Sequence, residues 1–177
     1  MRVYPAGTEP ETPLMTHFFK TMASPVGMLT LVAGANGLAA ILWEDDKPGR
    51  VRLGAMEEQA DHPVLVETAT QLTAYFAGER TSFDLPLDMA GSVFQKRVWA
   101  QLLAIPFGQT RSYAEIARAI GSPGAVRAVG AANGRNPVSI VAPCHRVIGS
   151  NGTLTGFAGG LEAKRYLLVH EGLELAL

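Results

Sequence analysis

Residues 112–134 read SYAEIARAIGSPGAVRAVGAANG and govern the architecture expected for the second half of the chain. Ser112 and Glu115 have the spacing of a capping box, and the helix that they begin ends at Gly121 after barely two turns. Ser122 then caps a second helix, which carries proline at its first position and runs almost to the end of the stretch. Two short helices joined by a Gly-Ser-Pro turn predict a helix-turn-helix, although many small helical domains contain such pairs.

The second of these helices is built almost entirely from small residues. Within residues 124–132, Val126 and Val129 can face the core, and Arg127 is the one long side chain. Such a helix has few side chains with which to read base edges, but its backbone can approach a nucleic acid closely. Two interpretations remain open here: a tightly packed Ala/Gly helix with a solvated arginine, and a smooth nucleic-acid surface with one projecting cation.

A further helix is predicted just before this stretch. Ser92 and Gln95 form another capping box, and the helix should cover residues 93–105. Its apolar face is supplied by Val93, Trp99, Leu102 and Leu103.

The first half of the chain has a different character. Apolar runs over residues 17–23, 28–33 and 38–43 are separated by turn residues, which predicts an antiparallel three-stranded meander. A helical pattern then runs from Pro63 to a stop at Gly78, through Val66, Ala69, Leu72 and Phe76. The polar residues between the meander and this helix are assigned to no element. The chain is thus expected to be an α+β protein.

Three segments follow from this organisation. Residues 1–16 contain three prolines among polar residues, so we expect a flexible tail. Residues 17–88 should form a small N-terminal α/β domain, and residues 92–177 a mostly helical C-terminal domain.

The two halves also differ in charge. Residues 1–91 contain 6 Lys+Arg and 12 Asp+Glu, a net charge of −6. Residues 92–177 contain 9 Lys+Arg and 4 Asp+Glu, a net charge of +5, and the two values add to the net charge of −1 of the whole chain. The basic half is either a simple electrostatic complement of the acidic half or the part that meets a polyanion.

Composition excludes several classes of protein. With 177 residues, 47% hydrophobic and 18% charged, the chain is expected to fold rather than to remain disordered. No apolar run approaches the roughly 20 residues that cross a bilayer, and no signal-peptide core is present, so a cytoplasmic protein is expected, nucleoid-associated in a bacterium. A single cysteine, Cys144, excludes an internal disulfide and a multi-cysteine metal site.

Residues 136–149, NPVSIVAPCHRVIG, surround this cysteine. A cysteine in an apolar stretch is often an inert buried residue, but His145 and Arg146 place potential positive charge beside the sulfur, which favours the reactive thiolate. In an extended segment His145 would point away from Cys144, so a turn or a bridging water is needed to bring them together. Glu171, at the end of a helix predicted from residue 161, is a candidate third member of a Cys, His, carboxylate arrangement.

The segment Pro143-Cys144-His145-Arg146-Val147, with Asn136-Pro137 before it and Gly156-Phe157-Ala158-Gly159-Gly160 after it, resembles the active-site region of the O6-alkylguanine-DNA alkyltransferases, or methylated-DNA–protein-cysteine methyltransferases. The resemblance extends over nearly all of residues 92–177. It includes Phe94-Gln95, Val98-Trp99, Arg111-Ser112-Tyr113, Arg127-Ala128-Val129-Gly130 and Leu167-Leu168-Val169-His170-Glu171-Gly172. The first half is similar to the family's ribonuclease-H-like domain only in its strand order and in Ala74-Tyr75-Phe76-Ala77-Gly78.

The resemblance implies a methylated-DNA–[protein]-cysteine S-methyltransferase. Cys144 would take the alkyl group from O6 of guanine, or less readily from O4 of thymine, in an irreversible, single-turnover reaction. His145 would deprotonate Cys144 through a water and Glu171 would support the imidazole. Asn136 would hold the active-site turn, and Tyr113 would donate a proton or hydrogen bond to the departing guanine.

The resemblance also implies a way of binding DNA. Arg127 would fill the gap left by the flipped nucleotide, and the small residues around it would lie in the minor groove of double-stranded DNA. The DNA-binding set is then Arg127, Tyr113, Ser122, Gly124, Ala125 and Gly130, and the base pocket is formed by Val147, Phe157 and Ala158. We expect no cofactor, no metal and no membrane contact, and a monomer in solution.

Departures from the family pattern and rival functions limit these expectations. Some relatives hold a structural zinc through cysteines that this chain lacks, and Phe157-Ala158 lacks a hydroxyl found in some members. We expect a repair protein without a second methyl-acceptor domain. The rivals are a non-catalytic binder of alkylated DNA, a helix-turn-helix regulator with an incidental cysteine, and a multiple-turnover cysteine hydrolase.

Overall fold

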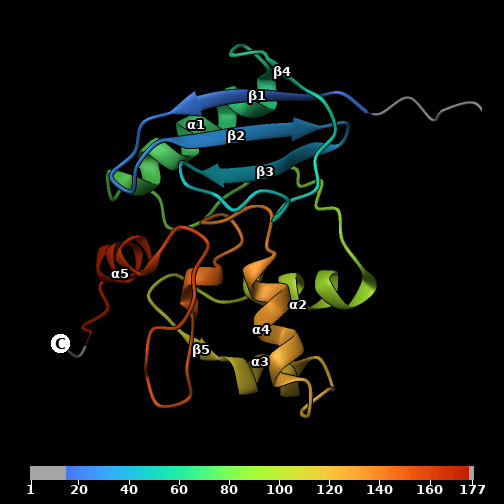
Figure 1. The fold of residues 1–177 in the computed structure, drawn as a ribbon. Coiled ribbons are helices and arrows are strands. Elements are labelled where there is room, and N and C mark those ends of the chain that lie inside the picture. Colours follow the sequence, from blue (N-terminus) through green and yellow to red (C-terminus); the bar gives the residue numbers. More distant parts are fainter. Residues whose placement is uncertain (1–14, 176–177) are drawn as a thin grey trace, which may run out of the picture.

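The structure is a computed structural model, and it describes residues 15–175. It consists of a four-stranded sheet with a long helix on one face and of a mostly helical second half that lies below the β3 edge of the sheet (Figure 1). This is the α+β architecture expected from the sequence. No helix among residues 15–175 is both long and apolar enough to span a bilayer.

The sheet contains the predicted meander. Strands β1, β2 and β3 pair antiparallel in that order, and they cover His17–Met22, Leu29–Gly34 and Gly37–Trp43. A fourth strand, β4 (Met56–Glu58), pairs parallel to β1 at the outer edge. The sequence did not indicate β4, because all three of its residues are exposed and show no alternation of apolar and polar side chains. Of the predicted tail, only Met15 and Thr16 belong to the described residues, and both are exposed.

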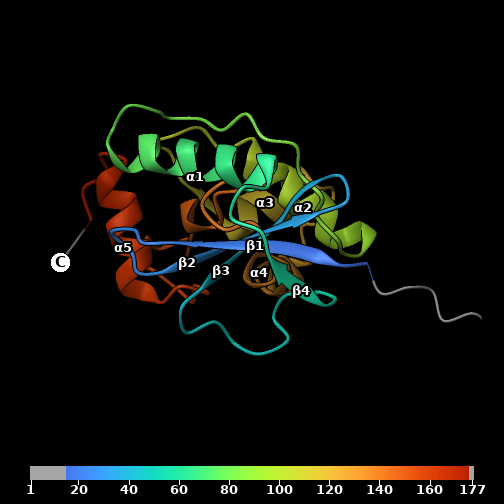
Figure 2. The same cartoon turned by 90° about the horizontal axis from the view of Figure 1, so that it is seen from above.

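Helix α1 (Pro63–Phe76) covers one face of the sheet, as Figure 2 shows from above. The helix ends at Phe76, and Gly78, the predicted stop, follows two residues later with a φ of +77°, the left-handed conformation that favours glycine. Of the predicted apolar face, Leu72 is buried and Ala69 and Phe76 pack against the core, but Val66 is 43% exposed and Leu65 is buried in its place.

Within residues 92–175 the structure contains four α-helices and a two-stranded parallel sheet. Strands β5 and β6 pair over Arg111–Ser112 and Val147–Ile148, and the helices α2, α3, α4 and α5 cover Val93–Leu103, Tyr113–Ala119, Val126–Gly134 and Leu161–His170. Both predicted capping boxes, at Ser92 and at Ser112, are present. Helix α2 ends two residues earlier than predicted. Its terminal residues Val93 and Leu103 are 78% and 46% exposed, so the buried face consists of Val98, Trp99 and Leu102.

Helix α4 also differs from the prediction at its start. Ser122 does not cap it: the backbone closes a turn there, with Ala125 N donating to Ser122 O at 2.9 Å, and the helix begins at Val126 without a side-chain cap. The phase of the helix buries Val129 but leaves Val126 38% exposed, so only one of the two valines faces the core as expected.

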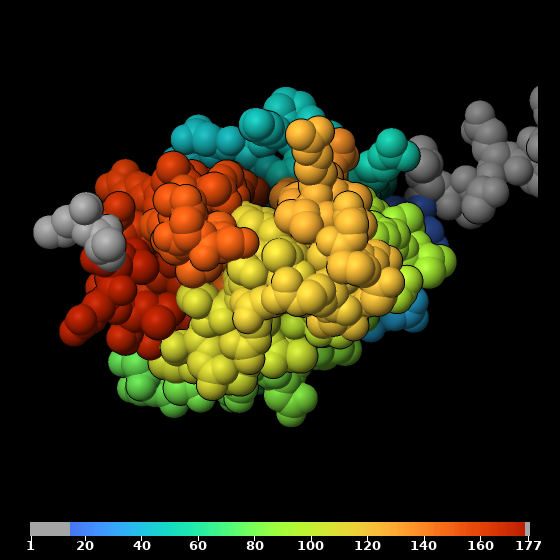
Figure 3. Space-filling view, turned by 90° about the horizontal axis from the view of Figure 1, so that it is seen from below, coloured from blue at the N-terminus to red at the C-terminus, as the bar shows by residue number. Residues whose placement is uncertain are grey.

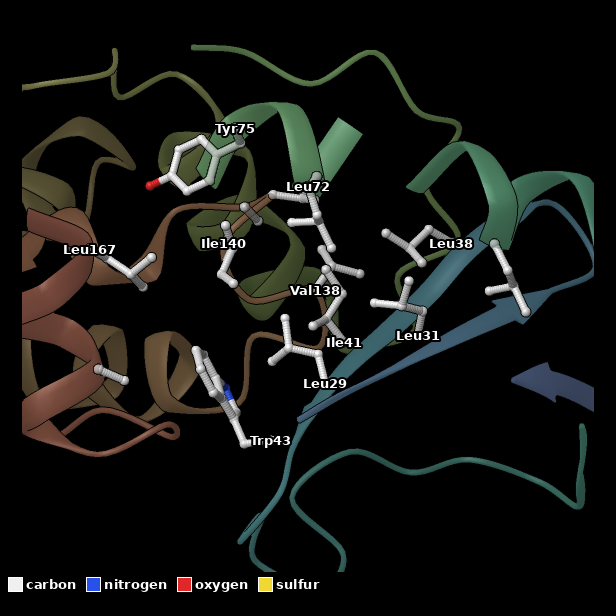
Figure 4. Packing of buried hydrophobic residues seen from close by; sticks show 14 of the residues in the cluster. Leu29, Leu31, Leu38, Ile41, Trp43, Leu72, Tyr75, Val138, Ile140 and Leu167 are labelled. Carbon is white, nitrogen blue, oxygen red and sulfur yellow. The ribbon is translucent and has the colours of Figure 1, made fainter. Parts of the chain in front are cut away.

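The two halves share one hydrophobic core. The residues between α4 and Cys144 run beside β3, where Ile41 N donates to Pro137 O at 2.8 Å. Val138 and Ile140 from this segment enter the core between the sheet and Leu72 of α1, and Leu167 of α5 joins them (Figure 4). The segment that precedes the cysteine is therefore packed directly onto the sheet.

Candidate active site

Cys144, His145 and Arg146 form a single turn of 3₁₀-helix, η1 (Cys144–Arg146), closed by Arg146 N donating to Pro143 O at 2.9 Å. The chain is therefore bent at the cysteine rather than extended. The cysteine is 2% exposed and His145 is fully buried.

Glu171 follows the last residue of α5 and lies beside this turn. Its Oε1 is 2.8 Å from His145 Nε2, so the contact expected between these residues is present. An ionised carboxylate can only accept hydrogen bonds, so Nε2 carries the hydrogen and Nδ1 is the basic nitrogen. Nδ1 is buried and has no hydrogen-bond partner within residues 15–175. The imidazole is thus held at one nitrogen and free to accept a proton at the other.

The Glu171 carboxylate accepts hydrogen bonds from two other side chains. Arg146 donates from Nε to Oε2 and from Nη2 to Oε1, both at 2.8 Å, and Tyr75 of α1 donates its hydroxyl to Oε1 at 2.8 Å. The sequence did not indicate the part played by Tyr75, because it is 96 residues from Glu171.

Opposing effects set the protonation of this pair. Burial tends to raise the pKa of Glu171, but the hydrogen bonds from His145 and Arg146 outweigh it and hold the pKa at about 2. Burial lowers the pKa of His145 in spite of the carboxylate beside it. At neutral pH the contact therefore joins a charged carboxylate to a neutral imidazole.

Burial raises the pKa of the Cys144 thiol. Hydrogen bonds from the side chains of Asn136 and Ser139 and the positive charges of Arg50 and Lys164 act against that rise. Arg146, which the sequence placed beside the sulfur, instead binds Glu171 and donates Nη1 to the carbonyl of Ile105 at 2.6 Å. The cations that favour the thiolate thus come from distant parts of the chain.

Asn136 closes the loop that leads to the cysteine. Its Nδ2 donates to Ala142 O at 2.7 Å, and its Oδ1 accepts from Val138 N at 3.1 Å. Inside this loop Ile140 has a φ of 75°, a left-handed conformation that costs a non-glycine residue on the order of 1 kcal/mol or more. The two hydrogen bonds of Asn136 and the surrounding core maintain this conformation.

Two residues of the sheet domain also hold this loop. Arg50 binds the Asp46 carboxylate with two nitrogens at 2.6 and 2.7 Å and donates Nη1 to Asn136 O at 2.7 Å. Trp43 donates its indole N–H to Ser139 Oγ at 3.1 Å.

Lys164 of α5 is a buried cation that the sequence analysis missed. Its Nζ donates to Val147 O at 2.6 Å and to Thr155 O at 3.0 Å, and burial lowers its pKa to about 8. The available indication was its position: Lys164 lies on the same helix face as the buried Leu167 and Leu168.

The predicted base-pocket residues meet around the cysteine only in part. Val147 and Cys144 are buried in one hydrophobic cluster, and Tyr113 and Phe157 pack against it. Thr155 Oγ1 donates to the Tyr113 hydroxyl at 3.0 Å. Phe157 and Ala158 line a cavity of about 560 Å³, together with α4 and residues 47–50, but Cys144 and Val147 do not line it.

The predicted DNA-binding residues lie in α3, in α4 and in the turn that joins them. Figure 3 shows α3, α4 and the loop of residues 149–158 side by side on one face of the molecule. Arg127 is exposed, and its side chain makes no hydrogen bond or ion pair with any residue from 15 to 175. Gly130 faces the Tyr113 ring, because a Cβ atom on Gly130 would lie 3.8 Å from it. Gly124 has open space around it, with no atom within 4 Å of such a Cβ.

Known proteins share both halves of this chain. Residues 93–173 match the family described as 6-O-methylguanine DNA methyltransferase, DNA binding domain, and residues 18–89 match its ribonuclease-like domain. The methylated-DNA–protein-cysteine methyltransferase of Mycolicibacterium paratuberculosis is 52% identical over 153 residues, which is 86% of this chain and 91% of that protein. That of Mycobacterium bovis is 49% identical over 156 residues, 87% of this chain and 91% of that protein.

A solved structure agrees with the sequence comparisons. The Mycobacterium tuberculosis OGT in complex with DNA superposes with a TM-score of 0.76 at 48% identity, over 88% of this chain and 92% of that one. Both the sheet domain and the helical half are covered by family matches, and the identities to these relatives are close to one half over most of both chains. The chain belongs to the methylated-DNA–protein-cysteine methyltransferases, a family of DNA-repair alkyltransferases.

Proposed function

We propose that this protein repairs DNA by moving the alkyl group of O6-alkylguanine, and less readily of O4-alkylthymine, onto Cys144. The observation that carries the proposal is the buried turn in which the chain's single cysteine precedes a histidine that is paired with Glu171. That pairing orients a neutral imidazole with one unoccupied basic nitrogen, which is the group needed to take the thiol proton.

In the proposed reaction His145 Nδ1 receives the proton of Cys144 through a water molecule. The thiolate then attacks the alkyl carbon, so that an S–C bond forms as the C–O6 bond breaks. The bonding electrons pass to the guanine, which takes up a proton, and Tyr113 donates that proton or a hydrogen bond. Glu171 stabilises the imidazolium that forms, and Asn136 keeps the loop in the conformation that presents the sulfur.

The alkylated base must leave the duplex to reach a sulfur that is 2% exposed. Flipping a base out costs a few kcal/mol, and the cost is lower when its pairing is already impaired. We propose that the exposed Arg127 fills the gap in the stack, while the small residues near it allow α4 to enter the minor groove. These contacts come from Ser122, Gly124, Ala125 and Gly130, with Tyr113 beside the rotated phosphate. Phe157 and Ala158, which line the cavity beside α4, are proposed to pack against the base, with Val147 behind them.

The reaction is proposed to occur once per molecule. A thioether is not readily hydrolysed, and Cys144 is the one cysteine of the chain, so there is no second thiol to accept the alkyl group. This distinguishes the proposal from a cysteine hydrolase, which would turn over repeatedly. Sequence-specific binding that survives Cys144→Ala would instead indicate a regulator or a non-catalytic binder.

The test is to incubate the protein with a duplex that contains one O6-methylguanine and to determine the mass of the intact protein and of its peptides. We expect one added methyl group, located on Cys144, and repaired DNA that never exceeds one equivalent of protein. The control is Cys144→Ser, which should bind the duplex but acquire no methyl group. More than one turnover, or methylation at another residue, would contradict the proposal.

A further inference from the structure

One buried residue contacts the proposed catalytic machinery although it belongs to the sheet domain. Tyr75, in the last turn of α1, is fully buried, and its hydroxyl donates to Glu171 Oε1 at 2.8 Å. In Figure 4 its side chain leaves α1 with the hydroxyl oxygen on the side of α5. The hydroxyl therefore bridges the two halves of the chain at the carboxylate that holds His145.

Tyr75 and His145 share one acceptor atom. Both lie 2.8 Å from Oε1 of Glu171, and Arg146 Nη2 donates to the same oxygen, whereas Oε2 receives Arg146 Nε at 2.8 Å. A neutral donor on a carboxylate oxygen withdraws charge from it and fixes its direction. The strength of the His145–Glu171 hydrogen bond thus depends on a third group on the same atom.

The same residue also holds the end of α5 through its backbone. Tyr75 O is 2.7 Å from His170 Nε2, and the rings of these residues meet at a centroid distance of 4.9 Å. Phe83 and Phe107 pack on other sides of the tyrosine ring. These contacts hold the ring in place, and Glu171 Oε1 is the partner that the hydroxyl has in the described part of the chain.

We propose that Tyr75 is a positioning residue that fixes the Glu171 carboxylate and moderates its pull on His145, so that the sheet domain takes part in activating Cys144. This rests on the proposed function of Cys144 and His145. Loss of the hydroxyl leaves more negative charge on Oε1, which favours the protonated imidazole and raises the pKa of His145. A His145 that is already protonated cannot take the thiol proton, so a higher pKa of His145 slows transfer on the acid side of the profile.

Other charged groups around this site do not change in the test. Arg146 and Lys164 act on His145 from η1 and α5, and burial together with Glu171 contributes the largest effects on its pKa. Of the other charged or titratable side chains nearby, His170 of α5 faces the Tyr75 ring, and Tyr166 of α5 faces His170. A change from tyrosine to phenylalanine at position 75 keeps all of these and removes one hydroxyl.

The experiment compares the full-length protein with Tyr75→Phe by single-turnover transfer from an O6-methylguanine duplex over a range of pH. We expect the acid limb of the rate profile of Tyr75→Phe to lie about 0.5 to 1 pH unit higher than that of the wild-type protein, a shift that corresponds to the loss of one hydrogen bond. At pH values below the midpoints of both profiles, the variant should then transfer the methyl group about 3- to 10-fold more slowly than the wild-type protein. The matched control is Tyr166→Phe, which removes a hydroxyl that makes no hydrogen bond within residues 15–175 and should leave the profile unchanged.

The same change made in a Glu171→Gln variant distinguishes positioning of the carboxylate from a simple loss of stability. The glutamine side chain carries no charge, so the double variant should have the same acid limb as Glu171→Gln alone. The inference would be overturned if Tyr75→Phe shifted the acid limb equally in the wild-type and the Glu171→Gln protein. It would also be overturned if Tyr75→Phe lowered the thermal stability but left the acid limb of the rate profile unchanged.

A DNA-independent measurement keeps this test distinct from that of the proposed function. The pH dependence of Cys144 alkylation by iodoacetamide reports the thiol directly, because the chain has no other cysteine. If the wild-type protein reacts with iodoacetamide but takes no methyl group from DNA, the proposed function fails. If both wild-type reactions occur and Tyr75→Phe leaves both profiles unchanged, the inference about Tyr75 fails.

Discussion

The indole N–H of Trp43 donates to Ser139 Oγ across 96 residues of sequence, at 3.1 Å and with both side chains buried. The same ring packs edge-on against Phe157 at a centroid distance of 5.3 Å. One side chain at the end of β3 thus contacts both the loop before Cys144 and the loop that lines the cavity beside α4. Changes at this contact should alter the active-site region without touching the cysteine.

The contact between Trp43 and Gly159 gives the first prediction. A Cβ atom on Gly159 would lie 2.6 Å from the indole ring, so Gly159→Ala should force the loop away from Trp43 and destabilise the protein by about 1–3 kcal/mol. Gly156→Ala is the control, because no atom lies within 4 Å of its Cβ, and it should change stability by less than about 0.5 kcal/mol. Urea unfolding of the three proteins measures the difference. Equal stabilities of the two variants would rule out the steric argument.

Asn136 gives the second prediction. Asn136→Ala removes both hydrogen bonds that close the 136–142 loop and leaves Val138 N and Ala142 O buried without them, at a cost of about 2–4 kcal/mol. It should also raise the pKa of Cys144, since the Asn136 side chain favours the thiolate. The rate of Cys144 alkylation by iodoacetamide over a pH series measures the pKa of the thiol. Asn36→Ala, a change at an exposed asparagine, is the control. An unchanged thiol profile would remove Asn136 from the activation of the sulfur.

The low pKa of Glu171 predicts a pH dependence of stability. Its pKa is about 2 in the folded protein and 4.5 for a free carboxyl, so the folded state gains stability above pH 4.5 that is lost as the pH falls towards 2. The loss is on the order of 3 kcal/mol. Glu171→Gln should lack this part of the acid destabilisation, whereas Glu162→Gln, an exposed change on α5, should retain it. Denaturant titrations between pH 5 and pH 2 compare the three, and parallel curves would contradict the assignment.

Arg127 supplies the fourth prediction. If it fills the gap left by a flipped nucleotide, Arg127→Ala should slow transfer from duplex DNA about 10-fold or more, while reaction with free O6-alkylguanine changes by less than about twofold. Arg165→Ala removes an equally exposed positive charge from α5 and should affect neither substrate. Single-turnover rates on both substrates provide the measurement. Equal losses on duplex and free base would exclude a gap-filling role.

The sequence by itself determined the local structure around the site. Capping boxes at Ser92 and Ser112 place two helices correctly, because their hydrogen bonds join residues three apart. Where the signal was less local, the prediction failed: α4 begins at Val126 rather than beside Ser122, since backbone hydrogen bonds close a turn first. The motif around Cys144 was sufficient to recognise the family, as its residues are nearly consecutive.

The tertiary structure alone decided which side chains surround the sulfur and its histidine. Tyr75, Arg50 and Lys164 come from α1, from the loop after β3 and from α5, and no spacing in the sequence connects them to residues 144–146. Buried polar groups must find partners wherever the packed core brings donors and acceptors together, and that arrangement depends on the whole fold. The sequence therefore singled out Cys144 and its neighbours, whereas packing of the two halves determined the charges that act on the sulfur.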